Sequence, residues 1–469
     1  MDLEYGREAF SMSSEVKTNK YEMDMCNGPL FSKIMVFSLP LMLSGLLQLL
    51  FNAADIVVVG RFAGSEALAA VGSTSSLINL LVNVFMGLSI GANVMVARYY
   101  GAGQKRELDE MIHTAIMTSI VSGVVLIFIG LIFAGPALRL MGTPEDVIEH
   151  SVLYMRIYFV GMPVMMLYNF GSAILRAVGD TKRPLYYLLF AGVINVVLNL
   201  IFVIFFHMGV AGVAAATVIS QVVSAYLVVR CLVLNDGSVH LDLKRLRINK
   251  DKLIKMVRIG VPAGLQGSMF SISNVLIQSA VNSFGSVVMA GNTAGQNLEG
   301  FVYTAMNALH QSAVSFTGQN YGARKYKRIV HITIICQGSV FVIGLGLSML
   351  LYFFSPQLLQ LYSTDPEVIQ YGIVRLSIIC ATYFLCGMMD VMVGVLRGMG
   401  YAIAPMIVSL TGVCAFRVIW IYTVFARFRT LEVLYISYPV TWSITFVVQL
   451  IMFIVIYKRL GYIMYEGEN

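Results

Sequence analysis

Residues 33–57 read KIMVFSLPLMLSGLLQLLFNAADIV, and no charged residue occurs between Lys33 and Asp55. A helix needs about 20 predominantly apolar residues to cross a bilayer, so this stretch predicts a membrane-spanning helix. Similar apolar stretches follow near residues 66–97, 110–134, 147–173, 184–206, 210–234, 256–283, 287–317, 329–354, 367–394, 402–426 and 431–457. The sequence therefore predicts an all-α polytopic membrane protein with twelve transmembrane helices.

The composition of the chain supports this fold class. Of the 469 residues, 58% are hydrophobic and only 12% are charged, whereas soluble proteins carry roughly 25% charged residues. So few charges cannot cover a water-facing surface, which excludes a soluble enzyme and a disordered chain. The long apolar runs exclude a transmembrane β-barrel, whose strands are short and alternate in polarity. The net charge of +7 is spread between apolar runs, so we expect no nucleic-acid partner.

The lysines and arginines are distributed unevenly along the chain. Of the 32, 25 lie in the two terminal tails or in the loops that follow every second apolar stretch. Cytoplasmic loops carry an excess of these residues, so we expect both termini to be cytoplasmic and the protein to lie in the cell membrane. Residues 1–30 lack the apolar core of a signal peptide and are expected to form a cytoplasmic extension.

The two halves of the chain repeat each other. Tyr100-Gly101-Ala102 matches Tyr321-Gly322-Ala323, and Leu175-Arg176 matches Leu396-Arg397, both at a spacing of 221 residues. Each half has six apolar stretches, so both halves enter the membrane in the same direction, and substrate sites in such parallel repeats lie between the lobes. The expected divisions are an extension (1–30), an N-terminal lobe (31–234), a cytoplasmic linker (235–255), a C-terminal lobe (256–460) and a cytoplasmic tail (461–469).

Four polar residues fall at a similar depth in the N-terminal lobe. Asp55 lies in the first apolar stretch, Asn195 and Asn199 lie one turn apart in the fifth, and Thr217 lies in the sixth. Ionisable groups inside membrane spans are costly and usually functional. A carboxylate with amide and hydroxyl oxygens suits a hard cation such as sodium, or a transferable proton. The alternative is a polar network that only holds the helices together.

A second set of polar residues predicts a cavity between the lobes. We expect the spans at 33–57, 66–97, 256–283 and 287–317 to line it. The acids Glu299 and Asp390 are candidates for coupling or substrate contact, with structural hydrogen bonding as the alternative. The other expected lining residues are Gln48, Asn52, Gln266, Asn274, Gln278 and Asn297.

The sequence lacks two common motifs of nucleotide-dependent and metal-dependent enzymes. The Walker and His-Glu-x-x-His patterns are absent, so we expect a protein that is not an enzyme. Without a nucleotide-binding motif, an ion gradient must supply the energy for transport. We therefore expect no cofactor, only a sodium ion or a proton as the coupling ion.

Several motifs resemble those of the multidrug and toxic compound extrusion (MATE) transporters. They are SLPLMLSGLLQLLFNAADIVVVGRFAGSEALAAVG at 38–72, LRAVGDTKRP at 175–184, LRGMGYAIAP at 396–405, and the two Tyr-Gly-Ala loops. The resemblance covers all twelve predicted spans. It implies a V-shaped fold of two six-helix lobes that exports organic cations in exchange for sodium or protons.

The resemblance also implies roles for particular residues. In prokaryotic members a cation site uses an aspartate of the first helix and polar residues of the fifth and sixth, which Asp55, Asn195 and Thr217 match. Asn199 occupies the place of a second aspartate and so halves the negative charge of the site. Other members use acids of the C-terminal lobe as sites, and in this sequence Glu299 and Asp390 are the nearest candidates for such acids.

The predicted function is that of a secondary active efflux antiporter for amphipathic, often cationic, organic compounds. Alternating access would move these compounds across the bilayer, and the chain would act as a monomer. A flippase for lipid-linked or polysaccharide precursors is the main alternative, and a channel is a weaker one. A flippase for pyrophosphate lipids needs several cavity arginines and often fourteen helices. Twelve spans holding three acids and three arginines favour the antiporter.

Overall fold

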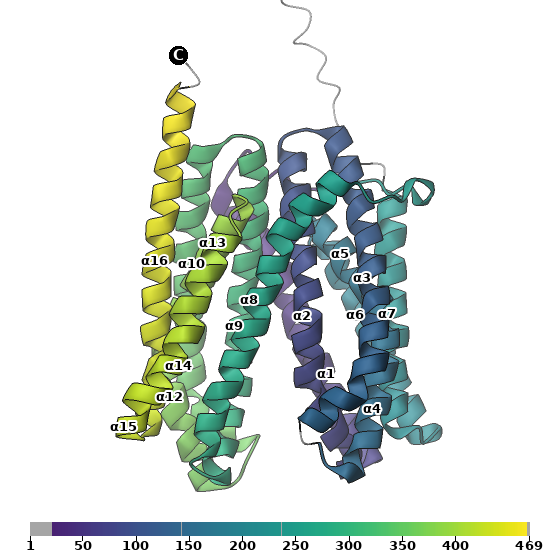
Figure 1. Ribbon diagram of the computed structural model, residues 1–469, viewed down its shortest axis with the longest axis vertical. Helices are drawn as coiled ribbons and strands as arrows, with labels where there is room; N and C mark the ends of the chain where they lie inside the picture. Colours follow the sequence, from purple (N-terminus) through teal and green to yellow (C-terminus); the bar gives the residue numbers. More distant parts are fainter. Residues whose placement is uncertain (1–20, 142, 236, 467–469) are drawn as a thin grey trace, which may run out of the picture.

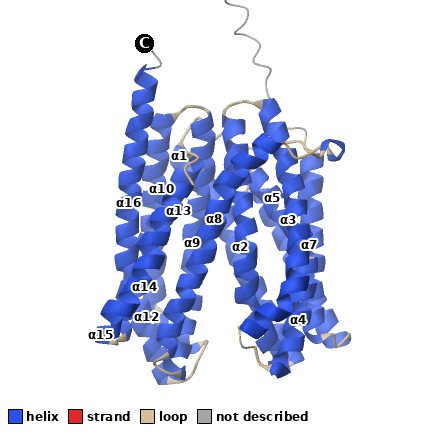
Figure 2. Cartoon of the chain, viewed as in Figure 1, coloured by secondary structure: helices blue, strands red, loops and turns tan. Residues whose placement is uncertain are grey.

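The computed structural model describes residues 21–141, 143–235 and 237–466, which form long helices joined by short loops (Figure 1). Among these residues no strand occurs (Figure 2). Several helices follow one another end to end, so that the described residues form twelve rods. The prediction of an all-α fold with twelve transmembrane helices is therefore confirmed.

Six rods form each lobe. The N-terminal lobe contains α1 (Leu30–Val58) with the π-helical turn Val59–Ala63, α2 (Ser65–Gly101), α3 (Lys105–Leu140), α4 (Glu145–Val160) with α5 (Met162–Ala177), α6 (Lys182–Leu200) with the π-helical turn Ile201–Phe205, and α7 (Gly209–Val233). The C-terminal lobe contains α8 (Lys250–Asn282), α9 (Ser286–Gly322), α10 (Tyr326–Phe353) with α11 (Ser355–Gln360), α12 (Pro366–Gly398), the rod of α13 (Ile403–Ser409), α14 (Phe416–Trp420) and α15 (Ala426–Phe428), and α16 (Leu431–Glu466).

The rods differ in how apolar they are. Among the described residues, nine rods are long and apolar enough to cross a membrane, and α4 with α5, bent by 49°, makes a tenth. The two remaining rods, α8 and α9, are long but are interrupted by polar residues such as Gln266 and Glu299. Polar side chains inside a membrane protein face the bundle interior or a water-filled cavity. The polarity of α8 and α9 therefore indicates that they border the centre of the protein.

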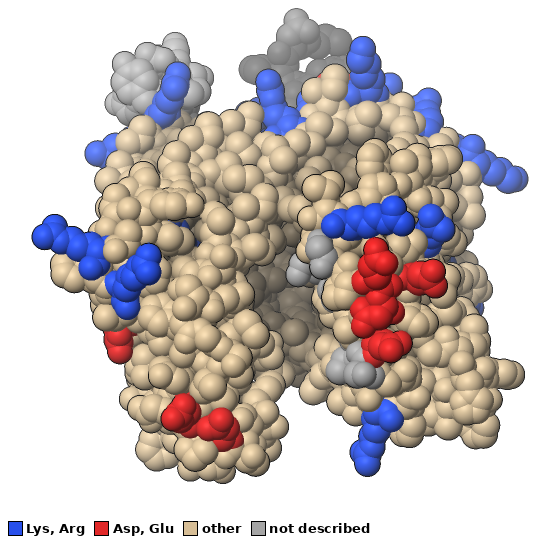
Figure 3. Space-filling view, turned by 60° about the horizontal axis from the view of Figure 1, so that its bottom comes forward, with Lys and Arg blue, Asp and Glu red and all other residues tan. Residues whose placement is uncertain are grey.

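The two lobes meet at one end and diverge toward the other (Figure 1). The end where they meet carries the starts of α3 and α6, the connection from α7 to α8 and the end of α9 (Figure 1). The basic residues Lys105, Arg183, Lys244 and Arg324 belong to these segments, and we call this end the basic end. Figure 3 views the molecule obliquely from the opposite end and shows a hollow between the lobes. The structure is therefore a V that is closed at the basic end and open at the other.

Close contact between α2 and α8 closes the basic end. A Cβ atom added to Gly87 would lie 2.3 Å from the backbone nitrogen of Gly264 and 2.4 Å from the carbonyl oxygen of Gly260. One added to Gly91 would lie 2.3 Å from the carbonyl oxygen of Met256. Such distances are below van der Waals contact, so only glycine lets these two backbones approach.

Residues 21–29 lie across the closed end and contact both lobes. The backbone N–H of Met23 donates to the carbonyl of Val178 in the N-terminal lobe (3.0 Å). The side chain of Asn320, at the end of α9, donates to the carbonyl of the fully buried Met25 (3.1 Å). Residues 1–20 of the expected extension lie outside the described residues, but residues 21–29 are an integral part of the interface between the lobes.

The connection between the lobes is shorter than expected. Helix α8 begins at Lys250, and the side chain of Asn249 caps it by accepting a hydrogen bond from the N–H of Asp251 (3.0 Å). The N–H of Asn249 donates to Thr114 Oγ1 of α3 (3.1 Å), and Lys252 forms an ion pair with Glu107. The predicted linker 235–255 therefore ends before residue 250, because an N-cap within a basic run starts the helix early.

We expect Gly87→Val to open the basic end, because its side chain cannot fit between α2 and α8, at a cost of about 1–3 kcal/mol. With spin labels at positions 105 and 324, double electron–electron resonance should then show a longer and broader distribution of the distance between the two labels. Gly72→Val is the matched control. Gly72 lies on the same helix as Gly87, but a Cβ atom added there meets nothing within 4 Å. An unchanged distribution in Gly87→Val would show that this contact does not hold the lobes together.

Candidate functional site

The structure brings Asp55, Asn195, Asn199 and Thr217 together in the N-terminal lobe. The side-chain amide of Asn199 on α6 donates to the carboxylate of Asp55 on α1 and to Asn195 Oδ1 (3.3 Å). The amide of Asn195 donates to Thr217 Oγ1 on α7 (3.4 Å). Residues 195 and 199 lie one helical turn apart, which places both amides on the same face of α6. The four side chains form one connected polar cluster, which we call the Asp55 cluster.

The Asp55 cluster carries a negative charge with no positive partner. Among the described residues, no Lys, Arg or His forms an ion pair with Asp55. The side-chain oxygen of Asn199 is buried and has no hydrogen-bond partner in the same part of the chain. A half-buried carboxylate beside an unsatisfied amide oxygen suits a small cation or a proton, because either would balance the charge.

Glu299 lies in a different setting, in the core of the C-terminal lobe. Its two carboxylate oxygens accept from Arg375 of α12, at 2.9 Å from Nε and 2.7 Å from Nη2. The Nη1 group of Arg375 donates to Asn292 Oδ1 (2.8 Å), which also accepts from the hydroxyl of Tyr435 (3.1 Å). Both charged residues are buried. This bidentate pair neutralises the charge of Glu299 within the protein.

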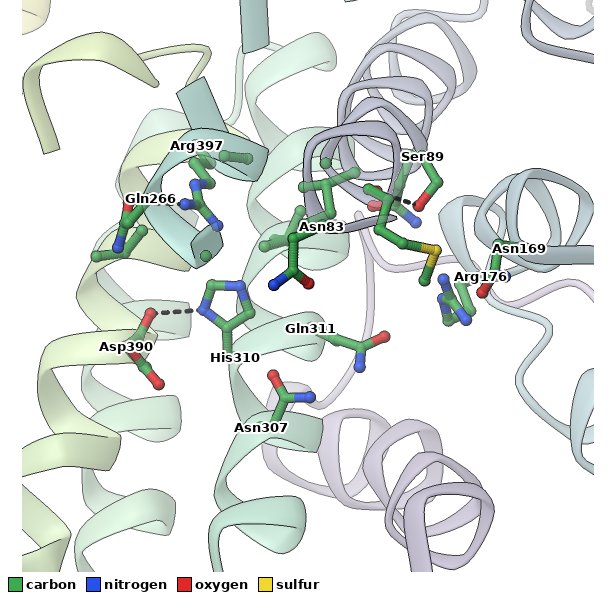
Figure 4. A pocket seen from close by; sticks show the side chains of 18 of the residues that line it. Asn83, Ser89, Asn169, Arg176, Gln266, Asn307, His310, Gln311, Asp390 and Arg397 are labelled. Atoms are coloured by element: carbon green, nitrogen blue, oxygen red, sulfur yellow. Dashed lines mark hydrogen bonds between the residues drawn. The ribbon is translucent and has the colours of Figure 1, made fainter. Parts of the chain in front are cut away.

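A central cavity of about 290 Å³ lies between the lobes. Helices α2, α5, α8, α9 and α12 contribute its lining, and Figure 4 shows that the labelled side chains approach it from both lobes. On one side His310 Nδ1 donates to the backbone carbonyl of Asp390 (2.6 Å), and the hydroxyl of Tyr303 donates to Asp390 Oδ2 (3.1 Å). Figure 4 shows Arg397 beside Gln266 and Arg176 beside Asn169, on opposite sides of Asn83.

The lining agrees only in part with the residues expected from the sequence. Gln266 and Asp390 line the cavity. Glu299 is instead held by Arg375 in the lobe core, away from this lining. The remaining expected residues are also outside the lining, namely Gln48, Asn52, Asn274, Gln278 and Asn297. Helix α1 contributes nothing to the cavity, because it packs beside α6 and α9.

The sequence reasoning missed the two cavity arginines. Arg176 and Arg397 match each other in the repeat, but their positions after the fourth and tenth apolar stretches predict loop charges. Both lie in the last turn of a membrane helix, α5 and α12, and line the cavity. Their match in the internal repeat could have predicted this placement, because equivalent positions in two lobes around one central axis face the same space.

We expect Glu299→Gln to destabilise the fold, because it leaves the buried guanidinium of Arg375 without its counter-charge, which costs about 3–5 kcal/mol. The measurement is the thermal unfolding midpoint of the purified protein in detergent. Glu367→Gln is the control, since Glu367 is exposed at the start of α12. If Glu299→Gln unfolded like the wild type but lost transport, Glu299 would act in coupling and not in structure.

Both halves of the chain match one family model. Residues 40–201 and residues 262–423 each match MatE, in agreement with the repeat found in the sequence. Solved structures of similar fold include an outward-facing multidrug resistance MATE family transporter of the MOP superfamily, with a TM-score of 0.88, 24% identity and coverage of 95% of this chain and 100% of that one. A MOP superfamily transporter from Pyrococcus furiosus, described as having a binding pocket of reverse polarity, also has a TM-score of 0.88, at 23% identity over 95% of this chain and 99% of that one.

Curated relatives cover most of the chain. The probable multidrug resistance protein YoeA of Bacillus subtilis is 30% identical over 87% of this chain and 90% of its own length. The FAD transporter of Shewanella oneidensis is 26% identical over 82% of this chain and 86% of its own length. The matched segments, the repeated lobes and the similarity to YoeA agree, and the chain belongs to the MatE family of membrane transporters.

Proposed function

We propose that this protein is a secondary active efflux antiporter, and not an enzyme, that exports amphipathic organic compounds in exchange for sodium ions or protons. The observation that carries this proposal is the uncompensated carboxylate of Asp55, which shares hydrogen bonds only with neutral side chains. Such a group is costly in a membrane unless a cation or a proton neutralises it. Exchange of that ion across the membrane can therefore be coupled to the conformation of the protein.

The path from the Asp55 cluster to the lobe interface runs along α1. This helix carries Asp55 in its last turns, and nearer its start the hydroxyl of Ser38 lies 2.7 Å from the hydroxyl of Ser312 on α9 in the other lobe. A change of charge at Asp55 alters how α1 packs on α6, and α1 also packs on α9. In this proposal the coupling ion thus acts on the contact between the lobes, and the cavity opens alternately to either side.

The names of the relatives support the export of small organic molecules. YoeA is named as a probable multidrug resistance protein, and the Shewanella oneidensis relative is named as a FAD transporter. Neither name describes a lipid flippase, so that alternative from the sequence gains no support here. One chain supplies both lobes and the whole lining of the cavity, so a monomer is sufficient for the proposed cycle.

We further propose that the basic end is cytoplasmic and that the protein lies in the cell membrane. The loops gathered at this end hold most of the lysines and arginines of the chain, and cytoplasmic loops carry such an excess. In this orientation the hollow between the lobes opens to the outside, which corresponds to the state that releases an exported substrate.

We expect Asp55→Asn to abolish gradient-driven efflux, because the amide keeps the size of the carboxylate but cannot bind a proton or balance a sodium ion. Dye efflux from proteoliposomes under an imposed proton or sodium gradient should fall to background. Asp146→Asn, an exposed position at the open end of the same lobe, should leave efflux unchanged. Wild-type rates in correctly inserted Asp55→Asn protein would show that Asp55 is only structural.

The orientation can be tested by cysteine labelling in a cysteine-free background. Arg247→Cys, exposed in the connection between the lobes, should react with an impermeant maleimide only after cells are permeabilised. Arg429→Cys, exposed before α16 at the open end, should react in intact cells. The reverse pattern would place the basic end outside and overturn the proposed topology.

A further inference from the structure

Two arginines related by the internal repeat line the central cavity from opposite lobes. Arg176 lies in the last turn of α5, and Arg397 lies in the last turn of α12. Both belong to the lining, and Figure 4 shows them on either side of His310 and Asn83. The pair therefore brings two fixed positive charges to one space at the closed part of the V.

The positive charge of these arginines is only partly balanced by the described residues of the protein. In the described residues, the guanidinium of Arg176 takes part in no hydrogen bond and no ion pair, and only its backbone carbonyl accepts, from the N–H of Gly179 (3.0 Å). Arg397 donates from Nη2 to the neutral Gln266 (2.8 Å), while its buried Nε has no partner there. The contrast with Arg375, whose guanidinium is fully engaged by Glu299 and Asn292, shows that this chain does pair arginines that have only a structural role.

One acid in the lining offsets only part of this charge. Asp390 is engaged by the hydroxyl of Tyr303, and no ion pair within 4.0 Å joins it to Arg397 or Arg176 among the described residues. With Asp390 ionised and His310 neutral, two arginines and one aspartate leave one net positive charge in the lining. A buried charge of this kind is costly until an anion enters.

The other residues of the lining indicate what the rest of such an anionic ligand is like. Met86, Ile90 and Phe270 supply an apolar and partly aromatic wall, and the amides of Asn307 and Gln311 add hydrogen-bonding groups. A guanidinium presents a planar fork of N–H donors that matches carboxylate and phosphate oxygens. The cavity thus combines a site for an anionic group with a surface for an apolar or aromatic body.

We propose that the central cavity binds aromatic organic anions, with Arg176 holding a carboxylate or phosphate group and Arg397 adding positive charge to the same space. This inference rests on the proposed function as an exporter and names the substrate class of its cavity. It replaces the organic cations that the family resemblance implies, because the charge of the lining has the wrong sign for them.

The test measures equilibrium binding of dyes to the purified full-length protein in detergent by fluorescence. Fluorescein supplies an aromatic carboxylate, 4-methylumbelliferyl phosphate supplies an aromatic phosphate, and ethidium supplies an aromatic cation. We expect the wild type to bind at least one anionic dye, and Arg176→Gln to weaken that binding roughly tenfold or more, because a charge-assisted contact is lost. The anionic dye that binds more tightly shows whether the site prefers a carboxylate or a phosphate group.

Two further variants separate binding from structure. Arg176→Lys keeps the charge and should retain much of the affinity, and the thermal unfolding midpoint of Arg176→Gln shows whether the variant keeps its fold. Arg156→Gln removes an exposed arginine of α4 outside the cavity lining and should bind the anionic dyes like the wild type. Equal affinity of Arg176→Gln and wild type, or binding of ethidium but of neither anionic dye, would overturn the inference.

The same dyes in proteoliposomes distinguish this inference from the proposed function. Gradient-driven efflux of ethidium without binding of either anionic dye would leave the antiporter proposal standing and reject the anion site. Binding of an anionic dye that depends on Arg176, without any gradient-driven efflux, would support the anion site and reject the coupled antiporter.

Discussion

A charged side chain inside a membrane protein needs a compensating partner, and this constraint organises the interior of the molecule. Glu299 and Arg375 compensate each other through two hydrogen bonds in the core of the C-terminal lobe. Arg417 lies 4.2 Å from the centre of the Tyr438 ring, where a cation–π interaction partly replaces its hydration. Asp55 and Arg176 are exceptions, because no ion pair compensates either of them among the described residues, and in the proposed function an exchanged ion or a substrate supplies the missing charge.

These exceptions divide the function between two places. Asp55 lies within the N-terminal lobe, away from the cavity lining, whereas Arg176 and Arg397 lie in the cavity between the lobes. In the proposed function, the coupling ion and the substrate therefore do not compete for one carboxylate. They would communicate through the packing of the lobes, which at the basic end depends on glycines of α2 and α8 and on residues 21–29.

The fold could be predicted from the sequence because membrane helices depend on local composition. Each apolar run is sufficient to define a span, and the repeat at 221 residues defined the two lobes. Part of the Asp55 cluster was predictable for the same reason. Asn195 and Asn199 share a helix face by their spacing, and the depth of Asp55 in its span placed it at the same level; the hydrogen bonds join all three.

The cavity could not be predicted in the same way, because its lining depends on how the lobes pack. Glu299 and Arg375 are 76 residues apart in the sequence, and nothing local indicates that they pair. Gln48 and Asn52 were expected in the cavity because α1 carries polar residues, but α1 packs beside α6 and α9 and leaves the lining to α5 and α12. Arg176 and Arg397 lie at helix ends, where a hydropathy pattern does not distinguish a loop charge from a buried one.

The central claim is that Asp55, and not Glu299, exchanges the coupling ion. Infrared difference spectroscopy on the reconstituted protein, comparing low with high pH and sodium-free with sodium-containing buffer, measures this directly through carboxyl and carboxylate bands. The account predicts a carboxyl or carboxylate difference band for at least one of these ions, present in the wild type and absent in Asp55→Asn. A band that persists in Asp55→Asn and disappears in folded Glu299→Gln protein would contradict the account.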